Sequence, residues 1–191
     1  MDFLTSLNSR IIVSDISYDI TNDFLSLEER EDFKTITNKK RAIEWLSTRY
    51  IIKKLYPSAF ISYGKNGEPL LNSCPEYKNI SISHGAEKIA LIFSNNNCGI
   101  DIDSPNRNFD KVANLVLNIK ERAIISEKDH GKAWCSKESI YKFYKGKNIS
   151  FLKDIVITDI DAKHLKISCK KHTHEVSIEE NERYILAYLD K

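Results

Sequence analysis

The chain has 191 residues, of which 41% are hydrophobic and 29% are charged, and its net charge is +2. This composition excludes a chain that is disordered throughout, and the length suits one sizeable domain or two small ones. The mild charge does not indicate a nucleic-acid partner, and no apolar run approaches the roughly 18 residues of a membrane span. We therefore expect a cytoplasmic globular protein without a membrane or nucleic-acid partner, in which the four cysteines are reduced thiols.

The first part of the chain predicts one strand and two helices. Residues 10–17 are rich in β-branched side chains, which favours a strand. Ser26 followed by Glu29 forms a capping-box pattern at the start of a short helix over 26–36. A longer helix over 39–56 ends before a proline and carries apolar residues at helical spacing.

The middle of the chain predicts a turn and a small sheet. Gly and Pro residues in 63–71 indicate the turn. Three short apolar runs follow, and we expect them to pair as strands of one sheet: 79–83, 89–94 and 98–102.

The remaining residues predict a helical zone over 109–125, a third helix that begins near Lys132, and a series of strands. The strands should be short and antiparallel, over 155–160, 164–170, 174–178 and 183–189. Since both halves mix helices with a few strands, we expect an α+β protein with two lobes, 1–97 and 98–191.

Asp101 and Asp103 are the first candidate functional residues. In a strand they share one face, while Ile100 and Ile102 face a core. A half-buried strand without a function shows the same alternation, and by itself this stretch favours that simpler interpretation. The alternative is a metal site, because two like charges on one face repel unless a cation or a basic group lies between them, and Mg²⁺ prefers such oxygen ligands.

The segment WCSKESIYK, which begins at Trp134, is the second candidate. Lys137 falls within the apolar arc of the expected helix, where a lysine must either extend to solvent or find an anion. Glu138 and Lys142 lie one turn apart at the edge of that arc, as a surface ion pair or as part of a phosphate site.

Histidines and a basic stripe give weaker signals. Ser83 and His84 end a predicted strand, where they are either structural or donors to phosphate oxygens. We expect His172 and His174 at the surface, without a zinc site. A further set follows i,i+4 spacing on one helix, and we expect a solvated face there, with anion binding as the alternative: Arg41, Trp45, Arg49 and Lys53.

The succession GKNGEP, SISHG, GIDID and, about thirty residues later, WCSKESIYK resembles the 4′-phosphopantetheinyl transferase superfamily, in particular its monomeric, two-lobed type. The resemblance implies transfer of 4′-phosphopantetheine from coenzyme A to a serine of an apo acyl or peptidyl carrier protein, which releases adenosine 3′,5′-bisphosphate. It also implies two pseudo-symmetric lobes, each a small, mostly antiparallel sheet packed with helices, with the active site between them.

The same resemblance implies roles for individual residues. Mg²⁺ would be bound by Asp101, Asp103 and Glu138 together with the pyrophosphate of coenzyme A, and the catalytic residues would be Glu138, Lys142 and Asp101. Ser83 and His84 would contact the 3′-phosphoadenosine end, and Lys137 the wall of the site. The full set of expected coenzyme A-binding residues is Lys40, Lys65, Gly67, Ser83, His84, Asp101, Lys137, Glu138 and Lys142.

Some positions depart from the family pattern. Glu68 stands where the family turn has lysine, and Lys65 in the same turn is the candidate replacement. Asp32 stands at a usually basic position, and Asp103 replaces a glutamate, which shortens its reach toward a metal. Two other functions stay open. One is a Mg²⁺-dependent phosphohydrolase of a nucleotide-like substrate, which would use the same three carboxylates, and the other is a non-catalytic coenzyme A-binding homologue, which Glu68 and Asp32 suggest.

Overall fold

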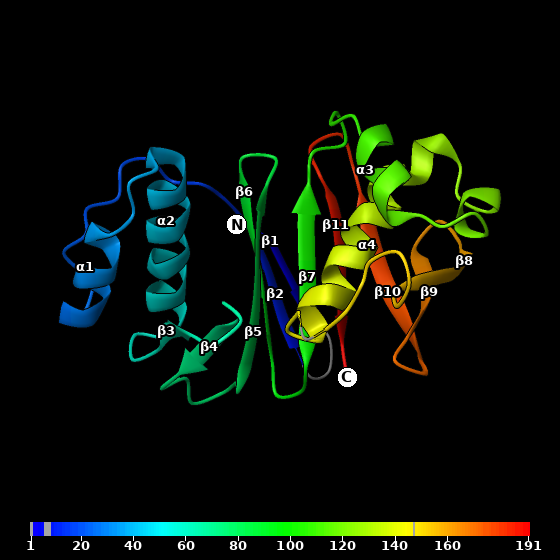
Figure 1. Ribbon diagram of the computed structural model, residues 1–191. Helices are drawn as coiled ribbons and strands as arrows, with labels where there is room; N and C mark the ends of the chain where they lie inside the picture. Colours follow the sequence, from blue (N-terminus) through cyan, green and yellow to red (C-terminus); the bar gives the residue numbers. More distant parts are fainter. Residues whose placement is uncertain (1, 6–8, 147) are drawn as a thin grey trace.

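The structure is a computed structural model that describes residues 2–5, 9–146 and 148–191. These residues form eleven strands and four α-helices, which Figure 1 labels in chain order. The helices are α1 (Leu27–Lys34), α2 (Lys39–Leu55), α3 (Asp110–Val116) and α4 (His130–Phe143). The strands are β1 (Asp2–Thr5), β2 (Ser9–Asp15), β3 (Phe60–Tyr63), β4 (Pro69–Asn72), β5 (Asn79–Gly85), β6 (Lys88–Ser94), β7 (Cys98–Asp103), β8 (Val156–Ile160), β9 (His164–Cys169), β10 (His172–Glu180) and β11 (Ile185–Asp190). No helix in these described ranges is long and apolar enough to cross a membrane.

The N-terminal half contains a four-stranded antiparallel sheet in the order β1-β2-β6-β5 and the separate hairpin β3-β4. Ile51 and Ile52 of α2 pack with residues of β2 and β6 in one apolar core. The predicted capping box is confirmed, because Ser26 Oγ accepts a hydrogen bond from Glu29 N (3.2 Å) and the Glu29 carboxylate accepts one from Ser26 N (3.1 Å). The helix predicted over 39–56 is likewise confirmed as α2.

The C-terminal half contains a five-stranded antiparallel sheet in the order β7-β11-β10-β9-β8, and α4 packs on one of its faces. One strand prediction is wrong in its pairing. Residues 98–102 were expected in the sheet of 79–83 and 89–94, but β7 pairs with β11, where Asp101 lies opposite Ala187. Residues near the end of the chain thus supply its ladder partner.

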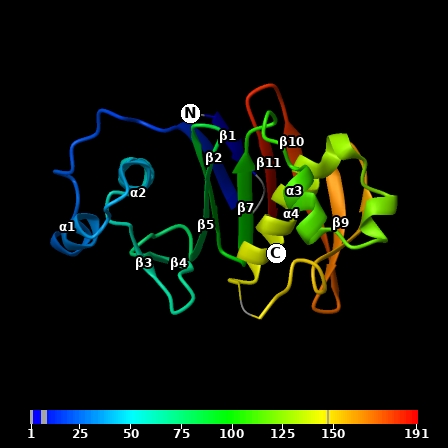
Figure 2. The same ribbon diagram turned by 45° about the horizontal axis from the view of Figure 1, so that its top comes forward.

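The two halves meet where β5 and β7 run side by side (Figures 1 and 2). Serine side chains join these strands in place of a backbone ladder. Ser81 Oγ accepts a hydrogen bond from Ile100 N (3.2 Å), and Ser83 Oγ accepts one from Ile102 N (3.3 Å). Figure 2 shows α1 and α2 on one side of this junction and α3 and α4 on the other.

Three further expectations need correction. The helical zone over 109–125 is broken after Val116, because the Asn118 side chain accepts hydrogen bonds from Lys120 N and Glu121 N and starts a separate short turn. The segment 63–71, expected only as a turn, also supplies β4 of a hairpin. His174, expected at the surface, is 4% exposed and its Nε2 lies 2.8 Å from the Tyr144 hydroxyl.

The fold is therefore α+β, with mostly antiparallel sheets packed against four helices in the described ranges. The division after residue 97 and the pseudo-symmetry of the two lobes stay predictions.

Candidate active site

Strand β7 presents two carboxylates on one face, as the alternation of its side chains predicts. Ile100 and Ile102 are buried in the apolar core between the two sheets, at 0% and 2% exposure. Asp101 and Asp103 face the opposite way and line a cavity of about 380 Å³. The strand thus fixes the direction of both acids.

Gly99 allows α4 to lie directly on this strand. A Cβ atom on Gly99 would lie 2.0 Å from the carbonyl oxygen of Ser139 in α4, a distance that no side chain tolerates. The close approach brings Glu138 and Lys142 of α4 to the edge of β7, where both line the same cavity as Asp101.

Asp101 is the most enclosed of the three carboxylates, at 6% exposure. Its Oδ1 accepts hydrogen bonds from Ser83 Oγ and from Lys142 Nζ, each at 2.6 Å. Lys142 Nζ also donates to the carbonyl oxygen of Ile100 (3.1 Å). One carboxylate oxygen therefore links β5, β7 and α4 at a single point.

Asp103 lies at the outer end of the strand, and both of its carboxylate oxygens have partners. Oδ1 accepts a hydrogen bond from Ser104 N (2.8 Å), and Oδ2 forms an ion pair with the guanidinium group of Arg107. Ser104 and Arg107 therefore hold the carboxylate of Asp103 toward the turn that follows β7.

Glu138 has an unusual protonation equilibrium. Burial, reinforced by the negative charge of Asp101, raises the pKa of Glu138 to about 7, although Lys142 and Arg107 oppose the shift. A carboxyl group with this pKa exchanges protons readily near neutral pH.

The three carboxylates are chemically suited to a hard divalent cation, because all are oxygen donors and all line one cavity. Their present arrangement is more open than a formed metal centre. Among the residues that the structure describes, no three His, Cys, Asp or Glu side chains gather closely enough to hold a metal ion. Lys142 and Arg107 instead provide the positive charges that Asp101 and Asp103 contact.

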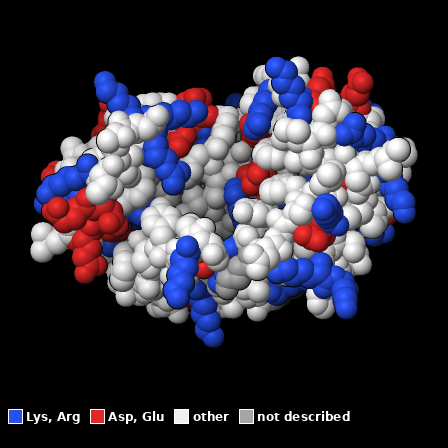
Figure 3. All heavy atoms as spheres, in the orientation of Figure 1, with Lys and Arg blue, Asp and Glu red and all other residues white. Residues whose placement is uncertain are grey.

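A second cavity of about 250 Å³ adjoins the first. Four side chains line both, and Figure 3 shows the molecule hollowed between the half that carries α2 and the half that carries α4. The shared residues are Arg41, Ile82, His84 and Lys142. Together the two cavities form one groove from the carboxylates to the β3–β4 turn.

His84 lies between the two cavities in its neutral form. Its Nε2 is 2.8 Å from Thr48 Oγ1, on the adjoining helix α2. Burial, followed by the positive charges of Arg41 and Lys142, lowers the pKa of His84 to about 4. At neutral pH the ring can accept or donate a hydrogen bond but adds no positive charge.

Arg49 forms a cationic wall of the second cavity. The expectation of a solvated face is wrong at this position, because Arg49 is 2% exposed, with its guanidinium carbon 3.2 Å from the centre of the Trp45 ring. Glu29 lies 3.7 Å away, but Arg49 Nε and Nη2 have no hydrogen-bond partner within the described part of the chain. A buried guanidinium of this kind is suited to an anion.

The turn with the unusual sequence lies at the far end of the second cavity. Gly67 and Glu68 both line it, and Gly67 has the positive φ of 79° that favours glycine. The Glu68 carboxylate accepts a hydrogen bond from Asn66 N (2.9 Å), so it is partly turned back into its own loop. Lys65 is exposed and is not among the residues that line either cavity.

The structure thus brings together most of the residues that the sequence predicted. Those that line the groove are Gly67, Ser83, His84, Asp101, Asp103, Glu138 and Lys142. Lys40 lines neither cavity. Its side chain is 76% exposed, and its Nζ lies 4.0 Å from Glu44 Oε1. The binding roles of Lys40 and Lys65 stay predictions.

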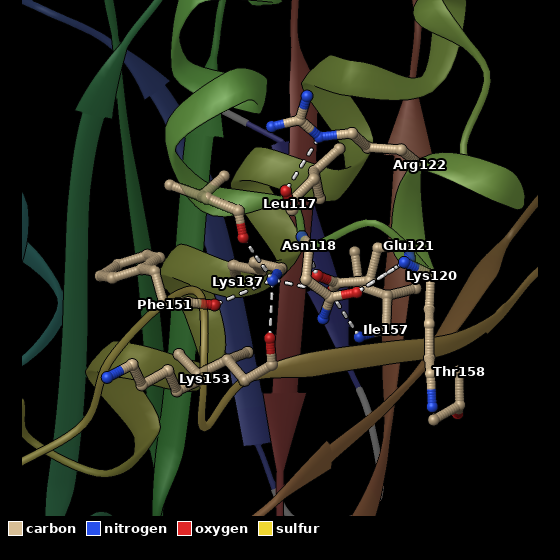
Figure 4. Close-up of polar contacts among 12 residues, drawn as sticks. Leu117, Asn118, Lys120, Glu121, Arg122, Lys137, Phe151, Lys153, Ile157 and Thr158 are labelled. Carbon is tan, nitrogen blue, oxygen red and sulfur yellow. Dashed lines mark hydrogen bonds and ion pairs between the residues drawn. The ribbon is translucent and has the colours of Figure 1, made fainter.

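Lys137 is the clear correction. It was expected at the wall of the site, but its side chain is 0% exposed and points toward Glu121, a residue that lines neither cavity (Figure 4). Its Nζ lies 2.7 Å from Glu121 Oε1 and donates to three carbonyl oxygens, those of Val116, Phe151 and Ile155. Lys137, which lies within the apolar arc, therefore pairs with the buried carboxylate of Glu121 and does not reach solvent or the groove.

Two residues of the groove gave no usable signal in the sequence. Thr48 contacts His84, and Arg107 contacts Asp103. Both contacts depend on how the chain folds between the two residues. Arg107 is four residues beyond Asp103, but this spacing does not predict a contact unless the conformation of the turn between them is known.

Comparison with known proteins agrees with this geometry. Residues 97–189 match the family model described as the 4′-phosphopantetheinyl transferase superfamily. The match covers β7, α4 and most of β11, and so contains Asp101, Asp103, Glu138 and Lys142. A search of curated proteins found no match. The match shows that residues 97–189 are a domain of the 4′-phosphopantetheinyl transferase superfamily.

Proposed function

We propose that the protein transfers 4′-phosphopantetheine from coenzyme A to a serine hydroxyl of an apo acyl or peptidyl carrier protein. The observation that supports this most directly is the meeting of Asp101, Glu138 and Lys142 at one cavity, in a member of a transferase superfamily. The adjoining cavity extends the groove past Arg41 and Arg49, which suits an anionic nucleotide such as the rest of coenzyme A.

Asp101, Asp103 and Glu138 are the residues that would hold Mg²⁺. When bound there, the ion supplies positive charge that neutralises the pyrophosphate oxygens. Their fit rests on the donor chemistry, since three carboxylates line one cavity and burial together with mutual repulsion raises the pKa of one of them.

The side chains of the protein perform the remaining steps. Lys142 supplies positive charge to the phosphate oxygens, and the Glu138 carboxylate accepts the proton of the carrier serine, directly or through water. The serine oxygen then forms a bond to the phosphorus atom that carries the pantetheine arm. The bond from this phosphorus to the bridging pyrophosphate oxygen breaks, and adenosine 3′,5′-bisphosphate leaves.

The test is incubation of the protein with coenzyme A, Mg²⁺ and a panel of apo carrier proteins, followed by intact-protein mass spectrometry. We expect one carrier to gain the mass of one phosphopantetheine. Breakdown of coenzyme A without carrier labelling would favour a phosphohydrolase, and no turnover with any carrier would favour a non-catalytic homologue.

The Glu138→Gln variant sharpens this test. We expect it to abolish transfer and to keep the circular dichroism spectrum of the wild-type protein, because Glu138 lies at the rim of a cavity and not in an apolar core. The matched control is Glu182→Gln, at an exposed position outside the groove, which should transfer at the wild-type rate. Full activity of Glu138→Gln would contradict the role proposed for this carboxylate.

A further inference from the structure

Arg107 is a cation that contacts the proposed metal ligand Asp103 at the outer end of the site, as Lys142 contacts Asp101 further in. Its guanidinium group forms an ion pair with Asp103 Oδ2, while Ser104 N donates to Asp103 Oδ1. Both oxygens of Asp103 are thus engaged within its own turn, and a metal ion cannot bind Oδ2 without competing with Arg107.

The guanidinium group of Arg107 has two aromatic neighbours in addition to Asp103. Its central carbon lies 5.2 Å from the centre of the Phe109 ring and 5.6 Å from that of Trp134. Aromatic faces attract guanidinium groups at such distances. Arg107 can therefore release Asp103 and still remain at the mouth of the cavity.

The strength of the ion pair between Arg107 and Asp103 depends on how far the two side chains are exposed to solvent. The side chain of Arg107 is 44% exposed and that of Asp103 is 16% exposed. The pair between Lys142 and Asp101 is more enclosed, with side-chain exposures of 26% and 9%. Exposed ion pairs are weak because water and salt screen them. The contact at Asp103 is therefore a competitor that an incoming divalent cation can displace.

We infer that Arg107 is an internal counter-ion of Asp103, which a divalent cation must displace before Asp103 can become a metal ligand. This inference rests on the proposed function only in its use of Asp101, Asp103 and Glu138 as metal ligands. Arg107 lowers the affinity of the site for the metal and, once displaced from Asp103, keeps the aromatic neighbours that it already has, Phe109 and Trp134.

The experiment measures Mn²⁺ binding by electron paramagnetic resonance, in the absence of coenzyme A and of any carrier protein. In Arg107→Gln the dissociation constant of Mn²⁺ should fall about two- to fivefold, the range that corresponds to loss of an exposed ion pair. The control is Lys111→Gln, which removes the same charge from an exposed position of α3 and should change the constant much less.

Trp134 gives an independent signal. The chain has two tryptophans, so a Trp45→Phe background leaves Trp134 as the single emitter. Titration with Mg²⁺ should change its emission when Arg107 is present, because the guanidinium moves relative to the ring. The change should be lost in Arg107→Gln, even though that variant binds the metal more tightly.

Several outcomes would overturn the inference. They are an unchanged or weaker Mn²⁺ affinity in Arg107→Gln, an equal tightening in Lys111→Gln, the same emission change with and without Arg107, or the absence of Mn²⁺ binding in all variants. If the predicted shifts occur but no carrier protein is labelled, the role of Arg107 stands and the proposed transfer fails.

Discussion

Replacement of Lys137 by methionine tests the largest difference between the expected and the observed site. The change removes the ammonium group but keeps an unbranched side chain of similar length. Lys137 is 0% exposed, as is its partner Glu121. Its Nζ also donates to the carbonyl oxygens of Val116, Phe151 and Ile155, at 2.8, 2.9 and 2.6 Å. The variant therefore leaves one buried carboxylate without its counter-ion and three carbonyl groups without this donor.

The expected loss in the free energy of unfolding is about 3–5 kcal/mol, because removal of one partner leaves the other charge buried and uncompensated. For a chain of this size, each kcal/mol corresponds to about 2–4 °C in Tm, so a decrease on the order of 10 °C is expected. Urea denaturation followed by circular dichroism measures the change. Lys153→Met is the matched control, since Lys153 is exposed on the neighbouring loop and its loss should cost less than about 0.5 kcal/mol.

A second substitution separates charge from packing. Glu121→Gln in the Lys137→Met background removes the uncompensated charge but keeps the amide oxygen as an acceptor for Ile157 N, which now donates to Glu121 Oε1 at 2.8 Å. We expect it to restore roughly 1–2 kcal/mol, as coupled neighbours do in a double-mutant cycle. If Lys137→Met keeps wild-type stability and instead weakens coenzyme A binding, the structural role assigned to Lys137 is wrong.

Three further predictions concern other parts of the molecule. In Gly99→Ala the new methyl group would overlap the backbone of α4, so we expect the free energy of unfolding in urea to fall by at least about 2 kcal/mol. The control is Gly67→Ala, whose added Cβ meets no atom within 4 Å and should cost about 1 kcal/mol. Arg49→Met should weaken coenzyme A binding in calorimetry, and Lys65→Ala should change it less, because only the arginine lines the groove; the reverse order would contradict this geometry. Burial lowers the pKa of His174, so at this site the folded state binds fewer protons than the unfolded state below about pH 6.5, and the contribution of His174 to stability falls as the pH falls. The free energy of unfolding of His174→Phe, relative to that of the wild type, should therefore be higher at pH 5 than at pH 8. A difference that does not depend on pH would refute the lowered pKa of His174.

Local patterns in the sequence determined several features correctly. The capping box at Ser26 and the helix of residues 39–56 depend on contacts between near neighbours, which the sequence displays directly. The placement of Asp101 and Asp103 on one face follows from the period of two in any strand. The order of the motifs was also sufficient to indicate the superfamily, which the match over residues 97–189 supports.

Contacts between distant segments could only be decided by the tertiary structure. The sequence showed that Lys137 must either extend to solvent or find an anion, but it did not show that Glu121 and three carbonyl groups from separate segments would surround it. In the same way, the pairing of β7 with β11 and the burial of Arg49 against Trp45 depend on how whole elements pack. The sequence by itself therefore determined which residues share one face of a strand or lie one turn apart on a helix. Only the tertiary structure decided which charges meet, because the energy of an ion pair depends on distance and burial, and neither follows from spacing along the chain.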